Sequence, residues 1–474
     1  MSDIIILGCG LSGMITALSL AKHNIPSTII EAKNASDSSF FDDIRTTALN
    51  AGSVDYFQKI DVWDVLSPEC GPINDIYVAD NKAEEMLHFS KEFTPHNQVM
   101  GYLIENNIFK KCLYDLVAAN KSITVLEGTG YKDIVNNEDG CEISVSDHPS
   151  LREASATTRH CEERSDVAIS SLMGSPRQAF GLPRDDDHST LTCKLLIACD
   201  GRNSKAKNLF FSNEIEQDYK QTAITFIVHH QKKHGGTAVE HFMPSGPFAI
   251  LPLKDEHRSS IVWTLPKDHA EVFMSLPLDE FTYMVQENFG QFLGKIQISS
   301  KIAAFPLKAH ATRKYYNKSI VLVADTAHII HPLAGQGLNQ GIKDIECLVG
   351  LLGKEEHRHC EEEDRSLSET KGPVLKLQAL GTSSPHLSAM PRAFSTGSLA
   401  RWQIDGYSNL LSNYQKLRQA DNENMLLITD SINGVFGSKS GIFHSARQLG
   451  FKAIETIPTF KKLLIKYAMG KRGS

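Results

Sequence analysis

Buried strands and amphipathic helices alternate in the hydrophobic pattern at the start of the chain. The continuous apolar run at residues 4–7 predicts a strand buried on both faces, as in a parallel sheet. A helical pattern follows at about 12–23 and a second strand at 27–31, which together predict one βαβ unit. Further elements are predicted as a helix at 108–119, strands at 123–127, 131–136, 142–146, 195–199 and 319–324, and a helix beginning near Gly337.

The pattern changes between residues 222 and 265. Strand-like runs at 223–229, 249–252 and 261–265 are separated by turns that contain glycine and proline. Such short runs predict an antiparallel sheet and therefore a second domain. The predicted fold class is α/β: a Rossmann-like domain, an interleaved antiparallel-sheet domain and a C-terminal helical segment.

Two polar segments, at about 150–192 and 355–406, lack hydrophobic periodicity. They share the run Arg-His-Cys-Glu-Glu, at 159–163 and 358–362, and so resemble two copies of a palindromic element inserted in frame. Because loop closure entropy grows slowly with length, both are predicted to be surface loops. The His-Cys pairs have no companion ligands at finger-like spacing, so no metal site is predicted.

Composition and charge narrow the class of protein. The 474 residues are 41% hydrophobic and carry a net charge of −7, which argues against a nucleic-acid partner. The nine cysteines form no C-x-x-C pair, so neither a zinc site nor a disulfide framework is predicted. No secretory signal precedes the first strand, and no apolar run approaches the roughly 18 residues of a membrane-spanning helix. We therefore expect a cytoplasmic protein.

A glycine-rich motif, Gly8-Cys9-Gly10-Leu11-Ser12-Gly13, lies between the first strand and the first helix. In this context Gly8 permits a tight turn, Gly10 lets a pyrophosphate approach the backbone, and Gly13 lets the helix pack on the strand. The helix N-terminus then offers free N–H groups to an anion. Glu31, after the second strand, is placed to bind an adenosine ribose. This motif alone does not choose between NAD and FAD.

Two further motifs each follow a buried strand. The first, at residues 198–204, contains Asp200 and by itself favours an ordinary Asp-Gly turn. The second runs from 323 to 339, where Asp325 is placed to bind ribityl hydroxyls ahead of a glycine-rich helix start. The alternative for the second motif is a helix start capped by Asn339 or Asp325, with His328 and His331 as structural residues.

The order and separation of these motifs resemble the group A flavoprotein monooxygenases, and within them the ubiquinone-biosynthesis hydroxylase family. The resemblance spans the chain outside the two inserted segments. It is also carried by the family-like segments at 45–50, 105–106, 246–253 and 457–470, and by Tyr414, Arg418, residues 420–422 and 429–430.

The resemblance implies a set of FAD contacts. The ADP half would be held by the first motif and Glu31, and the phosphate and ribityl region by Arg45, Asp200 and Asp325. The backbone of the last motif would face the flavin N1–C2=O, with Pro332 at the edge of the ring. The full expected set is Gly8, Gly10, Leu11, Ser12, Gly13, Glu31, Arg45, Asp200, Asp325, Pro332, Gly335, Gly337, Leu338 and Asn339. The resemblance does not assign a general base.

The resemblance also implies a reaction. FAD, reduced by NAD(P)H or another electron donor, would react with O₂ to give a flavin hydroperoxide that hydroxylates a polyprenylated phenolic precursor of ubiquinone. The sheet around residues 242–263 would form an apolar lid and a wall of the substrate site. A place in a ubiquinone-biosynthesis complex is a further expectation. The alternatives are a reductase-type or halogenase reaction on the same fold and a non-catalytic FAD-binding protein, although the W-x-W-x-I-P segment of the halogenases is absent.

The chain departs from the family pattern at four positions: Cys199, Ala324 and Thr326 replace Ala, Gly and Ala, and Asn107 stands where Arg is common. A methyl group at Ala324 is expected to crowd the cofactor.

The C-terminal tail is basic and amphipathic. Phe460, Leu463, Leu464 and Tyr467 share one helical face, which predicts either a peripheral contact with the inner membrane or a helix docked on its own domain.

The expected division of the chain follows from these patterns. The FAD-binding domain comprises residues 1–75, 98–210 and 312–354, with the inserted loop at about 150–192. The substrate domain comprises 76–97 and 211–311. The inserted loop at 355–406 and the C-terminal helical region at 407–474 complete the chain.

Overall fold

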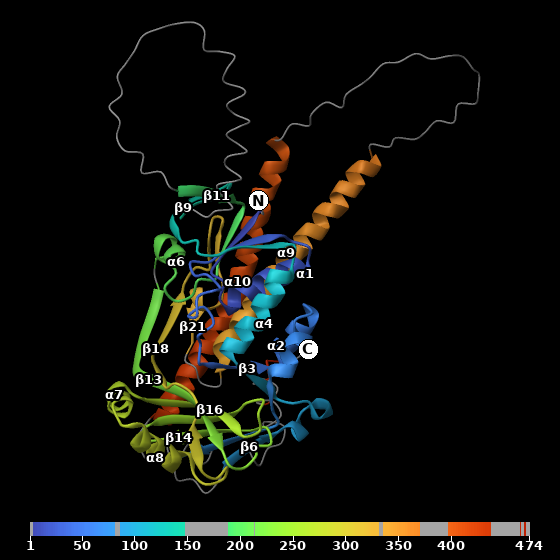
Figure 1. Cartoon of the computed structure of the whole chain (residues 1–474). Helices are drawn as coiled ribbons and strands as arrows, with labels where there is room; N and C mark the ends of the chain where they lie inside the picture. Colours follow the sequence, from blue (N-terminus) through green and yellow to red (C-terminus); the bar gives the residue numbers. More distant parts are fainter. Residues whose placement is uncertain are drawn as a thin grey trace, which may run out of the picture.

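The fold was analysed in a computed structural model of the chain, shown in Figure 1. The structure describes residues 3–80, 86–146, 188–212, 214–330, 335–369, 397–437, 465, 469 and 470. Two sheets dominate these residues, one mostly parallel and one mostly antiparallel. The predicted α/β class is confirmed.

The parallel sheet has six strands in the order β19-β20-β12-β1-β2-β8. At its centre, β1 (Ile4–Leu7) is fully buried between β12 (Leu195–Ala198) and β2 (Ser27–Ile30), which explains why its sequence is a continuous apolar run. The outer strands are β8 (Ile123–Leu126), β20 (Ile320–Leu322) and the antiparallel β19 (Tyr316–Asn317). All strands predicted for this sheet are therefore confirmed.

Helices cover this sheet and contact one another. The helix α1 (Leu11–Lys22) packs against α4 (Asn106–Ala119) and α9 (Gln336–Glu369). A further long helix, α10 (Gly397–Gly437), lies beside α9 and runs along the molecule toward the second sheet (Figure 1). Shorter helices are α2 (Ala51–Lys59), α3 (Trp63–Leu66) and α6 (Lys205–Phe210). Among the described helices, none combines the length and apolar character that a membrane crossing requires.

The second sheet has nine strands, eight of them in the order β21-β18-β13-β16-β15-β14-β5-β6. Strands β5 and β6, from the N-terminal part of the chain, extend the sheet by parallel pairing of β5 with β14, which is the interleaving that the sequence predicts. The bounds are β5 (Asp75–Asp80), β6 (Met86–Ser90), β13 (Glu214–His230), β14 (Thr237–Met243), β15 (Gly246–Pro252), β16 (Arg258–Pro266), β17 (Ile296–Ile298), β18 (Ala303–Thr312) and β21 (His328–Ile329).

Two helices, α7 (Lys267–Met274) and α8 (Leu278–Phe289), cover the outer face of the second sheet (Figure 1). Trp263 packs with Phe248 and Phe281 on this helix-covered face. Because alternate residues of a strand point to opposite faces, any wall of a substrate site on this sheet would be formed by the face that α7 and α8 leave uncovered, and not by Trp263.

Two small sheets complete the described fold. One contains β3 (Thr46–Asn50), β7 (Gly101–Glu105) and β4 (Gly71–Ile73), and the other contains β9 (Tyr131–Asn137), β10 (Gly140–Ser146) and β11 (His188–Cys193). The first inserted segment joins β10 to β11, two antiparallel neighbours, and residues 147–187 lie outside the described part. Residues 188–192, expected in a loop, belong to β11.

The second inserted segment also differs from the prediction. Helix α9 continues to Glu369 and α10 begins at Gly397, so the expected loop at 355–406 is helical at both ends. The first of these ends, at 355–369, is rich in Glu and contains two Arg, whose unbranched side chains have high helix propensity without any hydrophobic periodicity. Residues 370–396 lie outside the described part.

Candidate active site

The glycine-rich motif forms a turn that joins β1 to α1. Gly8 has φ +92° and its N–H donates to the Ile30 carbonyl at 2.9 Å, while a Cβ on Gly13 would lie 1.9 Å from the Gly8 carbonyl oxygen. Gly10 has no atom within 4 Å of the place a Cβ would take. Gly8 and Gly13 are thus required by the fold itself, whereas Gly10 faces open space. Leu11 and Ser12 lie in the first turn of α1, where N–H groups lack helical partners.

Glu31 stands directly beside this turn. Its two carboxylate oxygens accept hydrogen bonds from the backbone N–H groups of Cys9, at 2.8 Å, and Lys33, at 2.9 Å. These bonds fix the carboxylate at the mouth of α1, so the structure brings together the loop and the acid that the sequence pairs.

Asp200 lies against the opposite side of the turn. A Cβ on Gly8 would meet the Asp200 Cα at 3.0 Å. Tyr131 donates its hydroxyl to Asp200 Oδ2 at 2.6 Å, while Oδ1 is buried without a hydrogen-bond partner among the described residues. Burial raises the pKa of Asp200. The Asp-Gly turn favoured from the motif alone is present, with Gly201 at φ +78°, but it also carries this buried acceptor without a partner among the described residues.

The second and third motifs are joined by a hydrogen bond. The Gly201 N–H donates to Thr326 Oγ1 at 2.9 Å. Thr326 replaces the usual Ala of the family pattern, so this departure adds a link between the two motifs. It holds the loop that carries Asp325 beside the loop that carries Asp200.

Asp325 is exposed, and its carboxylate interacts electrostatically with basic groups on other segments. The surrounding protein displaces water and raises the pKa of Asp325, while His328, Arg45 and Arg202 act in the opposite direction. Arg45 is itself exposed, pairs with Asp43 at 2.6 Å and lies 5.5 Å from the Phe305 ring centre. Arg45 and Asp325, far apart in the sequence, therefore share one accessible area.

Ala324 does not crowd this area, contrary to the expectation from the sequence. Its side chain is only 1% exposed, and it packs against α9, where a Cβ added to Gly341 would lie 2.6 Å from the Ala324 Cβ. The substitution acts on the backbone instead. Ala324 has φ +55°, in the left-handed region that favours glycine, and alanine is strained there.

The N-terminus of α9 faces the region that contains Arg45, Asp325 and the start of α1. Gly335 has φ +62° and a Cβ there would lie 3.0 Å from Ala48 Cβ, whereas nothing lies within 4 Å of a Cβ on Gly337. A Cβ on Gly341, one turn further, would lie 4.0 Å from Ser12 Oγ of α1. The N-termini of α1 and α9 are therefore neighbours. Leu338 is half-buried against the core, and Pro332 and His331 lie outside the described residues.

Asn339 has a side-chain role that the sequence did not reveal. Its Oδ1 accepts hydrogen bonds from the Asn50 N–H at 3.0 Å and from Ser53 Oγ at 2.7 Å, and its Nδ2 donates to the carbonyls of Ala48 and Gly335 at 2.8 Å. The side chain is 1% exposed. It therefore fixes β3 and α2 against the start of α9, and only its backbone can face a ligand.

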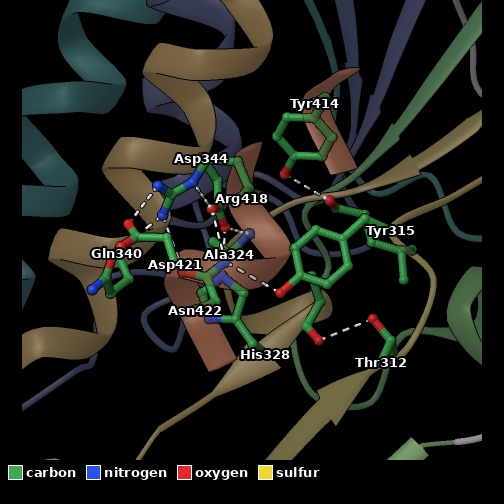
Figure 2. A network of polar contacts seen from close by, with 12 residues as sticks. Thr312, Tyr315, Ala324, His328, Gln340, Asp344, Tyr414, Arg418, Asp421 and Asn422 are labelled. Atoms are coloured by element: carbon green, nitrogen blue, oxygen red, sulfur yellow. Dashed lines mark hydrogen bonds and ion pairs between the residues drawn. The ribbon is translucent and has the colours of Figure 1, made fainter. Parts of the chain in front are cut away.

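A buried polar network, shown in Figure 2, supports the third motif from behind. Asp344 on α9 pairs with His328 Nε2 at 2.5 Å and with Arg418 Nε of α10 at 2.7 Å, and accepts from the Ala324 N–H at 3.2 Å. These partners lower the pKa of Asp344 to about 2 against the desolvation that burial imposes. His328 is thus structural, as the alternative interpretation proposes.

The C-terminal signature residues complete this network. Arg418 also pairs with Asp421 at 2.7 Å and donates to Asn422 Oδ1 at 3.0 Å, while Tyr414 donates to the Leu322 carbonyl at 3.1 Å. The sequence flagged Arg418 and Tyr414 only by resemblance and missed Asp344. An acid between the apolar residues Ile342, Ile345 and Leu348 of α9 was the available signal.

The arrangement fits an elongated, anionic dinucleotide. The N-termini of α1 and α9 lie side by side, and the glycines at positions 10 and 337 leave space for a ligand to approach the backbone. Asp200 Oδ1 is a buried acceptor without a partner among the described residues. The hydrogen bond from Gly201 to Thr326 connects the intervening loops. The described residues contain no cluster of potential metal ligands.

Comparisons with known proteins agree with this geometry. A family described as FAD binding domain matches residues 168–363. Ubiquinone hydroxylase UbiL of Rhodospirillum rubrum is 27% identical over 99% of this chain and 90% of its own length. The 3-demethoxyubiquinol 3-hydroxylase of Escherichia coli is 25% identical over 99% and 98%. The crystal structure of p-nitrophenol 4-monooxygenase PnpA from Pseudomonas putida shares the fold, with a TM-score of 0.65 at 12% identity over 100% of this chain and 99% of that one.

Fold, family match and relatives together define an FAD-dependent monooxygenase. Along nearly its whole length the chain is similar to ubiquinone-biosynthesis hydroxylases.

A first prediction concerns Gly10. Gly10→Ala should fold normally, because φ is −77° and no atom lies within 4 Å of the new methyl group, yet the methyl group would stand where a pyrophosphate approaches. We expect FAD affinity to fall about tenfold or more, the equivalent of one hydrogen bond to a charged group, in titrations of the apoprotein. Gly350→Ala, equally open but far along α9, is the control and should keep wild-type affinity.

A second prediction concerns strain at Ala324. Ala324→Gly should raise the free energy of unfolding by about 0.5–1 kcal/mol, because relief of the left-handed conformation exceeds the added entropy of the unfolded chain. Urea denaturation measures the change. Ala327→Gly, in the same turn at φ −88°, should instead be destabilising. Equal effects of the two variants would contradict the strain.

A third prediction concerns Asp344. Asp344→Asn should lower the free energy of unfolding by about 3–5 kcal/mol at pH 7, because it removes the buried charge that Arg418 and His328 share and leaves Arg418 with Asp421 alone. Since folding lowers the pKa of Asp344 from 3.8 to about 2, its contribution is complete above pH 3.8 and is lost as the pH falls toward 2. The difference between the variant and the wild type should shrink over that range, while exposed Asp268→Asn should show no such trend.

Proposed function

We propose that this protein is an FAD-dependent monooxygenase that hydroxylates the aromatic ring of a polyprenylated phenolic precursor of ubiquinone. The observation that carries the proposal is that three motifs far apart in the sequence meet at the neighbouring N-termini of α1 and α9. Relatives of that class match the chain over 99% of its length. The 3-demethoxyubiquinol 3-hydroxylase among them acts, by its name, on such a ring.

Each group of expected site residues would bind a different part of FAD. The turn from Gly8 to Gly13, with Leu11 and Ser12, would hold the pyrophosphate, and Glu31 would bind the adenosine ribose beside it. Asp200, Asp325 and Arg45 would line the middle section. The backbone of Gly335, Gly337, Leu338 and Asn339 would meet the flavin ring, with Pro332 at its edge. The network around Asp344 supports this division, because it fixes the Asp325 loop against the start of α9.

The chemistry follows from this placement. FAD, when bound and reduced by NAD(P)H or another donor, activates O₂ for transfer of an OH group to the ring. The N–H groups at the start of α9 would stabilise the negative charge that the reduced ring carries. The apolar inner face of the second sheet would exclude water from the reaction.

A polyprenyl chain partitions into lipid, so we propose that the enzyme meets its substrate at a membrane surface and works within a biosynthetic complex. The tail is described only in part. Ile465 and Met469 pack on Ala51, and the Gly52 N–H donates to the Met469 carbonyl at 3.0 Å, so this part is docked on its own domain. Phe460, Leu463, Leu464 and Tyr467 lie outside the described residues, and their membrane contact stays a prediction.

A fourth prediction tests the function. Deletion of the gene should cause accumulation of a quinone precursor one hydroxylation short, detected by mass spectrometry of lipid extracts. A plasmid copy of the wild type should restore the profile, whereas Gly10→Ala should restore it poorly. An unchanged quinone profile in the deletion strain would remove the assignment.

A further inference from the structure

The two faces of the nine-stranded sheet have different partners. Ile224, Phe226, Phe248, Ile250 and Trp263 lie in one cluster with the residues of α7 and α8. The residues between them in each strand therefore point the other way. This second set includes Ile227 on β13, Ser260 on β16 and Leu251 on β15.

The second face meets the candidate active site. Leu251 and Ile227 pack with Leu103 and Ala48, and Ser260 Oγ lies 2.9 Å from Thr46 Oγ1 on β3. Ala48 in turn touches the position of Gly335 at the mouth of α9. The inner face of the sheet thus continues directly toward the place proposed for the flavin.

Glu240 lies on this inner face. In β14 it pairs with Ala249 of β15 on one side and with Val78 of β5 on the other, so all three side chains share a face. Ala249 is two residues before Leu251, which lies next to Ala48, and therefore belongs to the face that leads to α9. The neighbours of Glu240 across the strands, Ala249 and Val78, are small and apolar.

The carboxyl group of Glu240 is unpaired among the described residues. No hydrogen bond or ion pair is made by Glu240 within the part of the chain that the structure describes, although it is half-buried in an apolar wall. Desolvation raises its pKa to about 7, and no charged group contributes to this shift. Asp80, in register with Phe242, is the other acid on this face of β5 and β14, whereas His241 and His88 point to the opposite face.

An unpaired carboxyl group in an apolar wall is unfavourable for stability. Such carboxyl groups are often found at binding sites, where a ligand supplies the missing partner. In apolar surroundings a carboxyl group can exchange protons near neutral pH. The ligand expected here is a phenol, which presents one hydroxyl group on an apolar ring.

We propose that Glu240 accepts the proton of the substrate's ring hydroxyl and so activates the ring for hydroxylation. The inference rests on the proposed function. The O–H bond of the phenol breaks and its electron pair stays on the oxygen, while the proton forms an O–H bond with the Glu240 carboxylate. The phenolate has greater electron density at the ring carbons that receive the OH group. The carboxylic acid then returns its proton to the product oxygen, so Glu240 ends the cycle as it began.

The test uses the FAD-loaded full-length enzyme and a phenol carrying one isoprene unit as the soluble probe. The flavin is reduced photochemically and mixed with O₂ and the probe, so that no electron donor needs to be known, and the hydroxylated product is measured by mass spectrometry from pH 5.5 to 9. The wild-type rate should rise across pH 7. Glu240→Gln should lower the rate about 100-fold, as for loss of a general base, and abolish the rise. Glu240→Asp should restore part of both.

Thermal unfolding provides a readout that does not depend on turnover. Because folding raises the pKa of Glu240 from 4.5 to about 7, its ionisation destabilises the fold, and this loss develops as the pH rises from 4.5 to 7. Glu240→Gln should therefore raise Tm at pH 8 relative to wild type, with a smaller difference at pH 5. The control is Glu287→Gln, an exposed carboxyl on α8 over the opposite face, which should change neither Tm nor rate.

The outcomes separate the two proposals. Wild-type rates and an unchanged rise across pH 7 in Glu240→Gln, with product still formed, would overturn the role of Glu240 and leave the function intact. A fully FAD-loaded wild type that hydroxylates no prenylated phenol would overturn the function and the inference together.

Discussion

The buried carboxylate of Asp344 is the constraint on which the site depends. It binds His328, Arg418 and the Ala324 N–H at once, and so ties α9, α10 and the Asp325 loop into one unit. A buried charge is stable only when its partners compensate for lost hydration, so none of the three segments can shift independently. The N-terminus of α9 consequently keeps its position beside the mouth of α1, where a Cβ on Gly341 would approach Ser12.

The second sheet contributes through the alternation of its strands. One face is filled by α7 and α8, and the other is turned toward the helix mouths. Glu240 is the acid without a partner among the described residues on that inner face, opposite Ala249. Cofactor and substrate would thus meet between two rigid elements, the start of α9 and the inner face of the sheet. The apolar wall that excludes water is also what makes an unpaired carboxyl group reactive there.

Much of the parallel sheet could be predicted from the sequence, because buried strands such as β1 are continuous apolar runs and the glycines at 8 and 13 are required by local geometry. Roles set by distant contacts could not. The side chain of Asn339 binds Asn50 and Ser53, and Ala324 packs on Gly341, both across long separations in the sequence. Glu240 carries no local signal, since only strand pairing shows which face it occupies. The helical ends of the second inserted segment lack the periodicity on which the prediction relied.

We propose that one continuous site runs from the N-terminus of α1 to the N-terminus of α9. A crystal structure of the FAD complex tests this most directly. We expect cofactor density from Gly10 past Asp200 and Asp325, with the isoalloxazine at Gly337 facing the inner side of the sheet that carries Glu240. An isoalloxazine bound away from the start of α9, or on the side of the sheet covered by α7 and α8, would contradict it.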